Sequence, residues 1–114
     1  MKIAFQINDI RGRKVVCTEE CWYSHILDEH QDMEGFEEEV KEAIQNPYPL
    51  PCVYQDRDYP SRHIYYRLFR TKKYSYYIKA IVDFSEPDEG ELITAFKTDS
   101  PKTGELMIWP ESHA

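Results

Sequence analysis

The chain has 114 residues, enough for one domain and too few for two, so we expect a single domain over residues 1–114. A formal net charge of −7 argues, taken over the whole chain, against non-specific attraction to nucleic acid or to anionic membranes. The sequence has no apolar run of about 18 residues, no basic-then-apolar segment in its start MKIAFQIND, and three cysteines at no recognised disulfide spacing, which together predict a cytoplasmic protein without a membrane span.

The first half of the chain predicts a hairpin and two helices. Residues 3–7 alternate apolar and polar side chains, and residues 14–17 return as a second strand after a polar turn. Thr18 precedes two glutamates, which favours a helix start because its hydroxyl can accept a hydrogen bond from a free N–H and the carboxylates suit the positive end of the helix dipole. This helix should end near residue 29. A second, amphipathic helix should begin near residues 32–34 and end at Asn46, before a proline.

The second half predicts an antiparallel sheet. An extended connector over residues 47–51 leads into a short strand at 52–54. The other predicted strands, separated by polar turns, are residues 62–70, 74–84 and 91–98, with a last edge strand at 107–109. We therefore expect an α+β fold in which an N-terminal hairpin and two helices pack on one face of a four-stranded antiparallel sheet.

Charge is divided unevenly along the chain. Residues 59–82 hold six basic side chains and no acidic one, whereas residues 19–42 hold ten acidic side chains and one lysine. The net charge of −7 is thus the sum of +6 over residues 59–82 and −13 elsewhere. It no longer excludes RNA, and it predicts that RNA contacts one face of the sheet while the acidic helices point away or toward a basic partner.

The two longest basic strands predict a nucleic-acid surface. We expect the apolar side chains of both strands to meet the helices, and an open face to carry Tyr65, Arg67, Tyr77 and Lys79. Cations interleaved with aromatic rings suit single-stranded RNA, because phosphates need positive charge and unstacked bases need flat partners. The candidate nucleic-acid-binding residues are Tyr65, Tyr77, Lys79, Arg70, Lys72 and Lys73. The alternative is a solvated tyrosine-rich face on which lysine and arginine offset neighbouring acids.

Two histidines of the first helix are the next candidates. Histidine titrates near neutral pH, so His25 and His30 can supply a neutral base and a protonated acid. The alternative is that each is a hydrogen-bonded residue at the edge of the core. Helical spacing places them about 140° apart, too far to act on one atom unless the helix ends before His30.

A metal site is the weaker interpretation. Cys17, Cys21 and His25 recur every four residues with Cys52 elsewhere, and these are zinc ligand types. Structural zinc more often shows paired Cys-x2-4-Cys knuckles, and HILDEH misses the His-Glu-x-x-His register. The sequence also lacks a Gly-rich phosphate loop and a Gly-x-Ser-x-Gly elbow. We expect neither a metal nor a cofactor.

Several segments together resemble a known family. They are TEECWYSHILDEH at 18–30, AIQNPYP, VYQDRDYPSRHIYYRLF, YYIKAIV, LITAFKT and the closing IWP. With their order, they are similar to the small barnase-EndoU-colicin-RelE-like nuclease domains of phages, mobile elements and bacterial toxin loci. The resemblance covers roughly residues 15–110, and its most specific parts are the helix carrying both histidines and Thr94-Ala95-Phe96.

The resemblance implies a metal-independent endoribonuclease without a cofactor. Carried over by position, its catalytic residues would be His25, His30, Arg67, with Lys79 as a second candidate cation, and Thr94. RNA would be the substrate and an antitoxin or immunity protein the protein partner, with neither DNA nor a membrane expected. The chain departs from the family in reading Glu29-His30-Gln31, where a basic residue before the histidine and a proline after it are common. The alternatives are an inactive RNA- or protein-binding domain of the same fold and a purely protein-binding acidic module.

Overall fold

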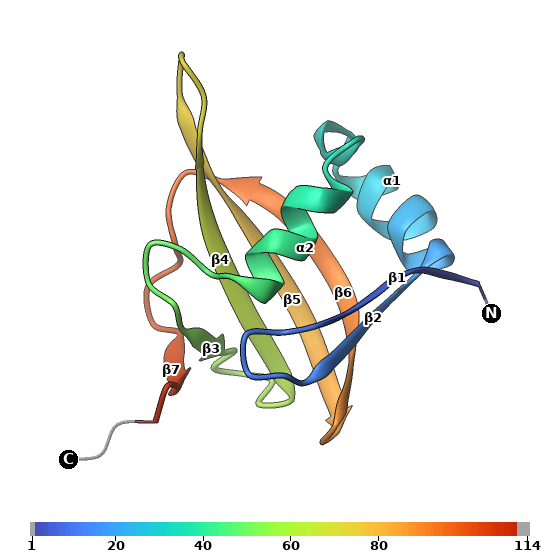
Figure 1. The fold of residues 1–114 in the computed structure, drawn as a ribbon, viewed down its shortest axis with the longest axis vertical. Helices are drawn as coiled ribbons and strands as arrows, with labels where there is room; N and C mark the ends of the chain where they lie inside the picture. The colour runs from blue at the N-terminus through green and yellow to red at the C-terminus, as the bar shows by residue number, and fades with distance from the viewer. Residues whose placement is uncertain (1, 112–114) are drawn as a thin grey trace.

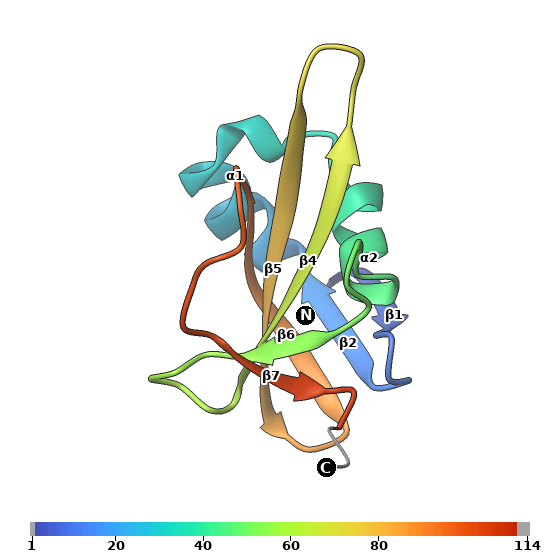
Figure 2. The same ribbon diagram turned by 90° about the vertical axis from the view of Figure 1, so that its left-hand side faces the viewer.

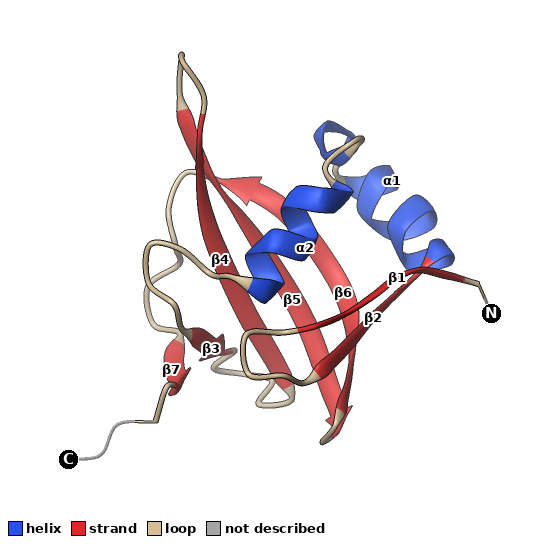
Figure 3. Cartoon of the chain, viewed as in Figure 1, coloured by secondary structure: helices blue, strands red, loops and turns tan. Residues whose placement is uncertain are grey.

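A single mixed sheet of seven strands runs through the protein, whose computed structural model describes residues 2–111 (Figures 1 and 3). The strand order across the sheet is β1-β2-β6-β5-β4-β3-β7. The strands are β1 (Ile3–Asn8), β2 (Lys14–Thr18), β3 (Val53–Gln55), β4 (Arg62–Arg70), β5 (Ser75–Glu86), β6 (Glu89–Thr98) and β7 (Leu106–Trp109). The helical segments are the π-helix η1 (Cys21–Ile26), α1 (Leu27–Glu29), the 3-10 turn η2 (Gln31–Met33) and α2 (Glu37–Gln45).

The α+β class is confirmed, whereas the predicted sheet of four antiparallel strands is only part of the real one. Strands β6, β5, β4, β3 and β7 do pair antiparallel in that order. The N-terminal hairpin is not a separate element, because Lys14–Val16 of β2 pair in parallel with Glu89–Glu91 of β6. This pairing satisfies backbone N–H and C=O groups that both strands would otherwise leave free at an edge.

The first helical segment starts as the sequence predicts and is less regular than predicted. The Thr18 hydroxyl accepts a hydrogen bond from the Cys21 N–H at 3.0 Å. Trp22 and Ile26, on one side of the segment, are fully buried. The segment ends at His30, whose N–H donates to the Ile26 carbonyl at 2.7 Å. The predicted second helix begins later than expected, because Gly35 takes a positive φ of 83°, a left-handed conformation that stops helical continuation before α2.

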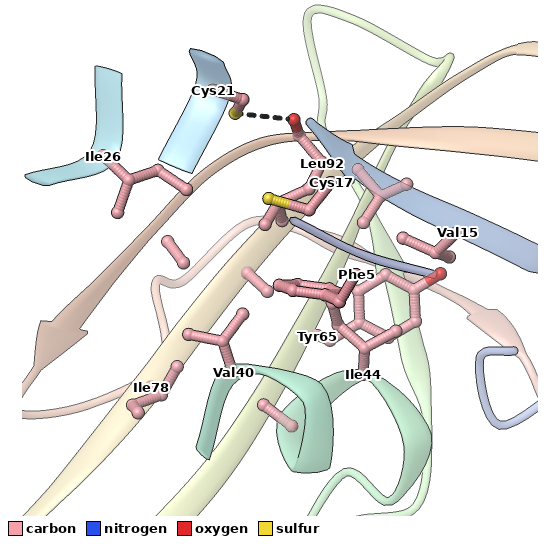
Figure 4. Close-up of a cluster of buried hydrophobic side chains, with 14 of the residues drawn as sticks. Phe5, Val15, Cys17, Cys21, Ile26, Val40, Ile44, Tyr65, Ile78 and Leu92 are labelled. Atoms are coloured by element: carbon pink, nitrogen blue, oxygen red, sulfur yellow. Dashed lines mark hydrogen bonds between the residues drawn. The ribbon is translucent and has the colours of Figure 1, made fainter. Parts of the chain in front are cut away.

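The core lies between the helices and one face of the sheet (Figure 4). Helix α2 buries Val40, Ala43 and Ile44 and contacts β4 and β5. Full burial of a valine or isoleucine side chain contributes about 1.5 to 3 kcal/mol to folding, so Val40 and Ile44 fix α2 on the sheet. The opposite face of the sheet is crossed by the chain between β6 and β7, which Figure 2 shows running back across the molecule. We call this opposite side the open face. Among the described residues, no helix is long and apolar enough to cross a membrane.

Candidate functional site

The pairing of β4 with β5 decides which side chains lie on the open face. Tyr65 is opposite Ala80, and Arg67 is opposite Ile78. Directly opposed residues share a face, and both Ala80 and Ile78 are fully buried in the core. Tyr65 and Arg67 therefore point toward the helices, and the prediction that they share the open face with Tyr77 and Lys79 is wrong.

Tyr65 is a core residue that offers no surface to RNA. Its side chain is 0% exposed, and its hydroxyl donates to Asp9 Oδ2 at 2.7 Å and accepts from Arg11 Nη2 at 3.1 Å. Burial, followed by the Asp9 charge, raises the pKa of Tyr65 well above its usual value. The expectation that this ring stacks on a base is thus corrected, and the residue instead joins β4 to the turn of the N-terminal hairpin.

Arg67 also has a structural setting. Its Nη1 donates to the Asn46 carbonyl at 2.7 Å, just beyond the end of α2, and its Nη2 lies 3.4 Å from Glu42 Oε1. Its guanidinium also lies over the Tyr48 and Phe69 rings, at 5.3 and 5.5 Å from their centroids. These contacts fix the C-terminal end of α2 and leave Arg67 on the other side of the sheet from Lys79.

Lys79 is the strand cation of the open face. Its Nζ lies 2.8 Å from Glu105 Oε2, and the residue is only 7% exposed. The other carboxylate oxygen of Glu105 accepts a hydrogen bond from the Tyr66 hydroxyl at 2.5 Å. On the neighbouring strands Lys79 is opposite Tyr66 and Phe96, and its ammonium lies 5.4 and 5.9 Å from the centroids of these rings. A charged and aromatic cluster thus occupies the middle of the open face.

His30 reaches this cluster from the edge of the sheet. Its ring stacks on Phe96 with centroids 5.1 Å apart and an interplanar angle of 29°. The helical segment that carries it packs along β6, where the Cys21 thiol donates to the Leu92 carbonyl at 3.0 Å (Figure 4). Because β2 pairs with β6 only at Glu89–Glu91, the rest of that strand edge is covered by this segment. His30 and Lys79 consequently contact the same aromatic ring.

Thr94 belongs to the same face. It is opposite Ile81 and precedes Phe96 by two residues on β6, so alternation places its side chain beside the Phe96 ring. Its diagonal neighbour across the pair is Lys79, at the roughly 7 to 8 Å typical of such positions. Of the residues predicted to be catalytic, the structure therefore gathers His30, Thr94 and Lys79 around Phe96.

His25 lies in a different environment. It is exposed and lines a cleft together with Glu20, Asp83 and Glu91. Three carboxylates at one cleft produce a negative potential that opposes the approach of an RNA phosphate. The structure thus places the two histidines in unlike surroundings, His30 on an aromatic ring beside a lysine and His25 among acids.

The remaining predicted RNA contacts lie on and near the β4–β5 hairpin, which projects from the body of the molecule (Figures 1 and 2). Its tip exposes Arg70, Lys72 and Lys73. The Thr71 hydroxyl orders this turn by accepting hydrogen bonds from the N–H groups of Lys73 and Tyr74, at 3.3 and 3.1 Å. Three exposed cations thus lie at one turn, and arginine and lysine are residues that contact backbone phosphates.

Tyr66, Phe96 and Glu105 were not predicted as site residues. Phe96 stands in the Thr-Ala-Phe string that carries the family resemblance, which is the one signal that pointed to it. Tyr66 is adjacent to another tyrosine, Tyr65, and nothing local distinguishes the two. Glu105 is 26 residues from its partner Lys79, so no local pattern joins them either. Within residues 2–111, no group of three or more His, Cys, Asp or Glu side chains is arranged to hold a metal ion.

Comparison with known proteins adds no assignment. No protein-family model matches the sequence, and neither a curated protein nor a solved structure matches it.

Proposed function

We propose that the protein is a metal-independent endoribonuclease of toxin-like or phage-derived type, which cleaves single-stranded RNA in the cytoplasm. The observation that carries the proposal is the gathering of His30, Lys79 and Thr94 around Phe96 on the open face. Cleavage by 2′-OH attack needs a base, an acid and a group that stabilises charge on the phosphate, and His30 and Lys79 are of the types that supply the first and the third. The family resemblance of the sequence supports the same reaction.

The residues of the open face divide the reaction between them. A neutral His30 ring nitrogen takes the proton of the ribose 2′-OH, the 2′-oxygen forms a bond to the adjacent phosphorus, and the bond from phosphorus to the 5′-oxygen breaks. Lys79 stabilises the charge that builds on the phosphate oxygens, and Thr94 orients the phosphate. Acid–base catalysis supplies roughly 10² to 10⁴-fold, and a donor aimed at the developing charge about 10² to 10³-fold.

Tyr66 is the proposed proton donor to the 5′-oxygen. In the structure the Tyr66 hydroxyl donates its one proton to Glu105, and burial, followed by this hydrogen bond, raises its pKa. The proton becomes available when the phosphate displaces Glu105, and its transfer to the 5′-oxygen then leaves a phenolate next to the Lys79 ammonium. Protonated His30 then returns a proton to the phenolate through solvent, which restores both groups.

The test is cleavage of a single-stranded RNA by purified protein in excess EDTA. His30→Ala and Lys79→Gln should each lower the rate at least a hundredfold, whereas the matched controls His25→Ala and Lys14→Gln should stay within a few-fold of wild type. Replacing the riboses by 2′-deoxyriboses should abolish cleavage and retain binding. Equal rates in His30→Ala, Lys79→Gln and wild type would mean that any cleavage comes from a contaminant.

A second candidate function is RNA binding without cleavage. It is favoured by the exposed cations Arg70, Lys72 and Lys73 of the hairpin tip, which can bind phosphates. Lys79, the cation that cleavage needs, is by contrast paired with Glu105 and almost without exposed surface. Retention on single-stranded RNA that weakens steeply between low and moderate salt, with no cleavage, supports this candidate.

A protein partner remains part of the proposal. Helix α2 exposes Glu38 and Glu42, and its first turn carries three glutamates, so the helix presents a negative surface. A basic antitoxin or immunity protein is the complementary partner. No retention on RNA would leave only this protein-binding role.

A further inference from the structure

A cleft of aromatic side chains lies on the open face beside Lys79. Its sheet side is formed by Tyr54 of β3, Tyr66 of β4 and Tyr77 of β5. Its other walls come from two connecting segments, residues 48–52 and Pro101. We call it the tyrosine cleft.

The three tyrosine rings meet at steep angles. The Tyr54 and Tyr66 centroids are 5.8 Å apart at an interplanar angle of 75°, and those of Tyr66 and Tyr77 are 6.4 Å apart at 89°. The Tyr66 ring therefore lies between the other two and is roughly perpendicular to both. At the rim Tyr48 is 47% exposed and Leu50 is 58% exposed, so apolar surface is open to solvent at this cleft. Such a setting suits a flat, weakly hydrated group.

The charges near the cleft indicate what the flat group would be attached to. Lys79 is opposite Tyr66 and two residues from Tyr77 on the same face, so a cation adjoins one end of the cleft. The side chains that line the cleft are uncharged: tyrosines, prolines, a leucine and a cysteine. Glu105, which accepts from the Tyr66 hydroxyl, is paired with Lys79, so an anion gains the cation by displacing this carboxylate. A flat group with an anion on one side, which is the shape of a nucleotide, complements this arrangement.

We propose that the tyrosine cleft takes one unstacked base of the RNA whose neighbouring phosphate binds at Lys79. The proposal rests on the proposed function and adds the base subsite to it. Unstacked bases bind proteins by stacking on aromatic rings, and the ring of each base offers a face for this, so the cleft contributes affinity more than sequence discrimination.

The test compares binding of a short single-stranded RNA, with 2′-deoxyriboses so that it is bound and not cleaved, with binding of a set of oligomers of the same sequence and sugars in which one abasic nucleotide is moved along the strand. In wild type an abasic nucleotide at one position should weaken binding most. The affinity should fall there by about 5- to 150-fold, the range for single base–aromatic stacks. Tyr77→Leu should bind the intact oligomer more weakly by the same factor. An abasic nucleotide at the sensitive position should then weaken its binding no further. Tyr77→Phe, which keeps the ring, should bind like wild type, as should Tyr23→Leu, which removes an exposed tyrosine of η1.

The outcomes separate the two proposals. If binding depends on Lys79 but on neither Tyr77 nor any single base, the tyrosine cleft is not a base subsite and the proposed function stands. A Tyr77→Leu loss that is equal for intact and abasic RNA also overturns the base subsite, because the ring then only supports the phosphate site. If wild type binds no RNA at all, both proposals are wrong. The abasic series on wild type overturns the base subsite by itself if no position matters. If Tyr77→Leu folds poorly, Tyr54→Leu removes another ring of the cleft and should lose the position dependence in the same way.

Discussion

Glu105 holds Lys79 in a buried ion pair, with 2.8 Å between the carboxylate and the ammonium and side chains that are 6% and 9% exposed, respectively. A phosphate that binds at Lys79 must displace this carboxylate, because both anions bind the same buried ammonium. Glu105 lies in the segment between β6 and β7, which also fixes the Tyr66 hydroxyl through the Lys102 N–H at 3.1 Å. The segment thus contacts both Lys79 and Tyr66.

Replacing Glu105 should therefore strengthen RNA binding and weaken the fold. In Glu105→Gln the phosphate no longer competes with a carboxylate, and since hydrogen bonds to charged groups contribute about 1.5 to 3 kcal/mol, the RNA dissociation constant should fall about ten- to a hundredfold. Breaking a buried pair costs about 3 to 5 kcal/mol when one partner is removed, so Glu105→Ala should be the less stable variant in urea.

The control for this prediction is Asp99→Asn, which removes an exposed charge from the same connecting segment. It should change RNA binding less than Glu105→Gln does, although both variants gain the same net charge. Weaker binding in Glu105→Gln would mean that the carboxylate positions Lys79 for RNA rather than competing with it.

His63 should make stability depend on pH. Burial, followed by the charge of Arg11, lowers the pKa of His63 from 6.5 to about 4. Arginine only donates, so Nδ1 of the neutral ring accepts from Arg11 Nη2 at 2.9 Å and has no place for a proton. Between pH 6.5 and 4 the unfolded chain therefore binds more protons than the folded one, and roughly 2 to 3 kcal/mol of stability should be lost as the pH falls through this range.

Urea unfolding at pH 7 and pH 4.5 measures this loss. His63→Gln should start less stable than wild type and show a smaller decrease between the two pH values. The matched variant His25→Gln, at an exposed position, should keep the full decrease. An equal pH dependence in wild type and His63→Gln would assign the effect to other groups.

The sequence predicts the elements of this fold well, because each strand carries its own alternation. The predicted strand at residues 62–70 coincides with β4, and the predicted ends of the other strands lie within two residues of the observed ones. The sequence does not predict the parallel pairing of β2 with β6. This pairing joins two strands that are far apart in the chain, and no local pattern indicates it. The late start of α2 follows from the conformation of one glycine, Gly35.

The site was harder to predict because adjacent tyrosines made the two faces of β4 look alike. Tyr65 and Tyr66 are both large, amphipathic and buried, so hydropathy does not decide which one faces the helices. Tyr65 points inward because Asp9 and Arg11, from the distant hairpin turn, supply partners for its hydroxyl. The sequence identifies His30, Lys79 and Thr94 as candidates. Only the structure shows that all three lie around Phe96.

Gly90 should be required for the stable pairing of the N-terminal hairpin with the rest of the sheet. It pairs with Val15 in the parallel ladder, and a Cβ at this position would lie 2.5 Å from Val82 Cγ1 and 2.7 Å from the Phe84 ring. Overpacking of this kind costs typically about 1 to 3 kcal/mol, so Gly90→Ala should lower the free energy of unfolding by at least that amount. Ser85→Ala, at an exposed position of β5, is the control and should unfold like wild type. A Gly90→Ala protein as stable as wild type would show that the ladder can shift to admit the methyl group.

The tip of the β4–β5 hairpin should determine much of the salt dependence of RNA binding. For single strands, the slope of log affinity against log salt is about −0.7 per neutralised phosphate, so replacing Arg70, Lys72 and Lys73 together by glutamine should make the slope shallower by roughly 2. Affinity at low salt should fall for all RNA sequences alike, because phosphate contacts position the strand without reading it. The matched control replaces Lys2, Lys14 and Lys41, which lie outside the acid-free stretch, and should leave the slope within about half a unit of wild type. Filter binding of one RNA across a salt series measures both slopes. Two equal slopes would mean that RNA contacts the protein elsewhere than at the hairpin tip.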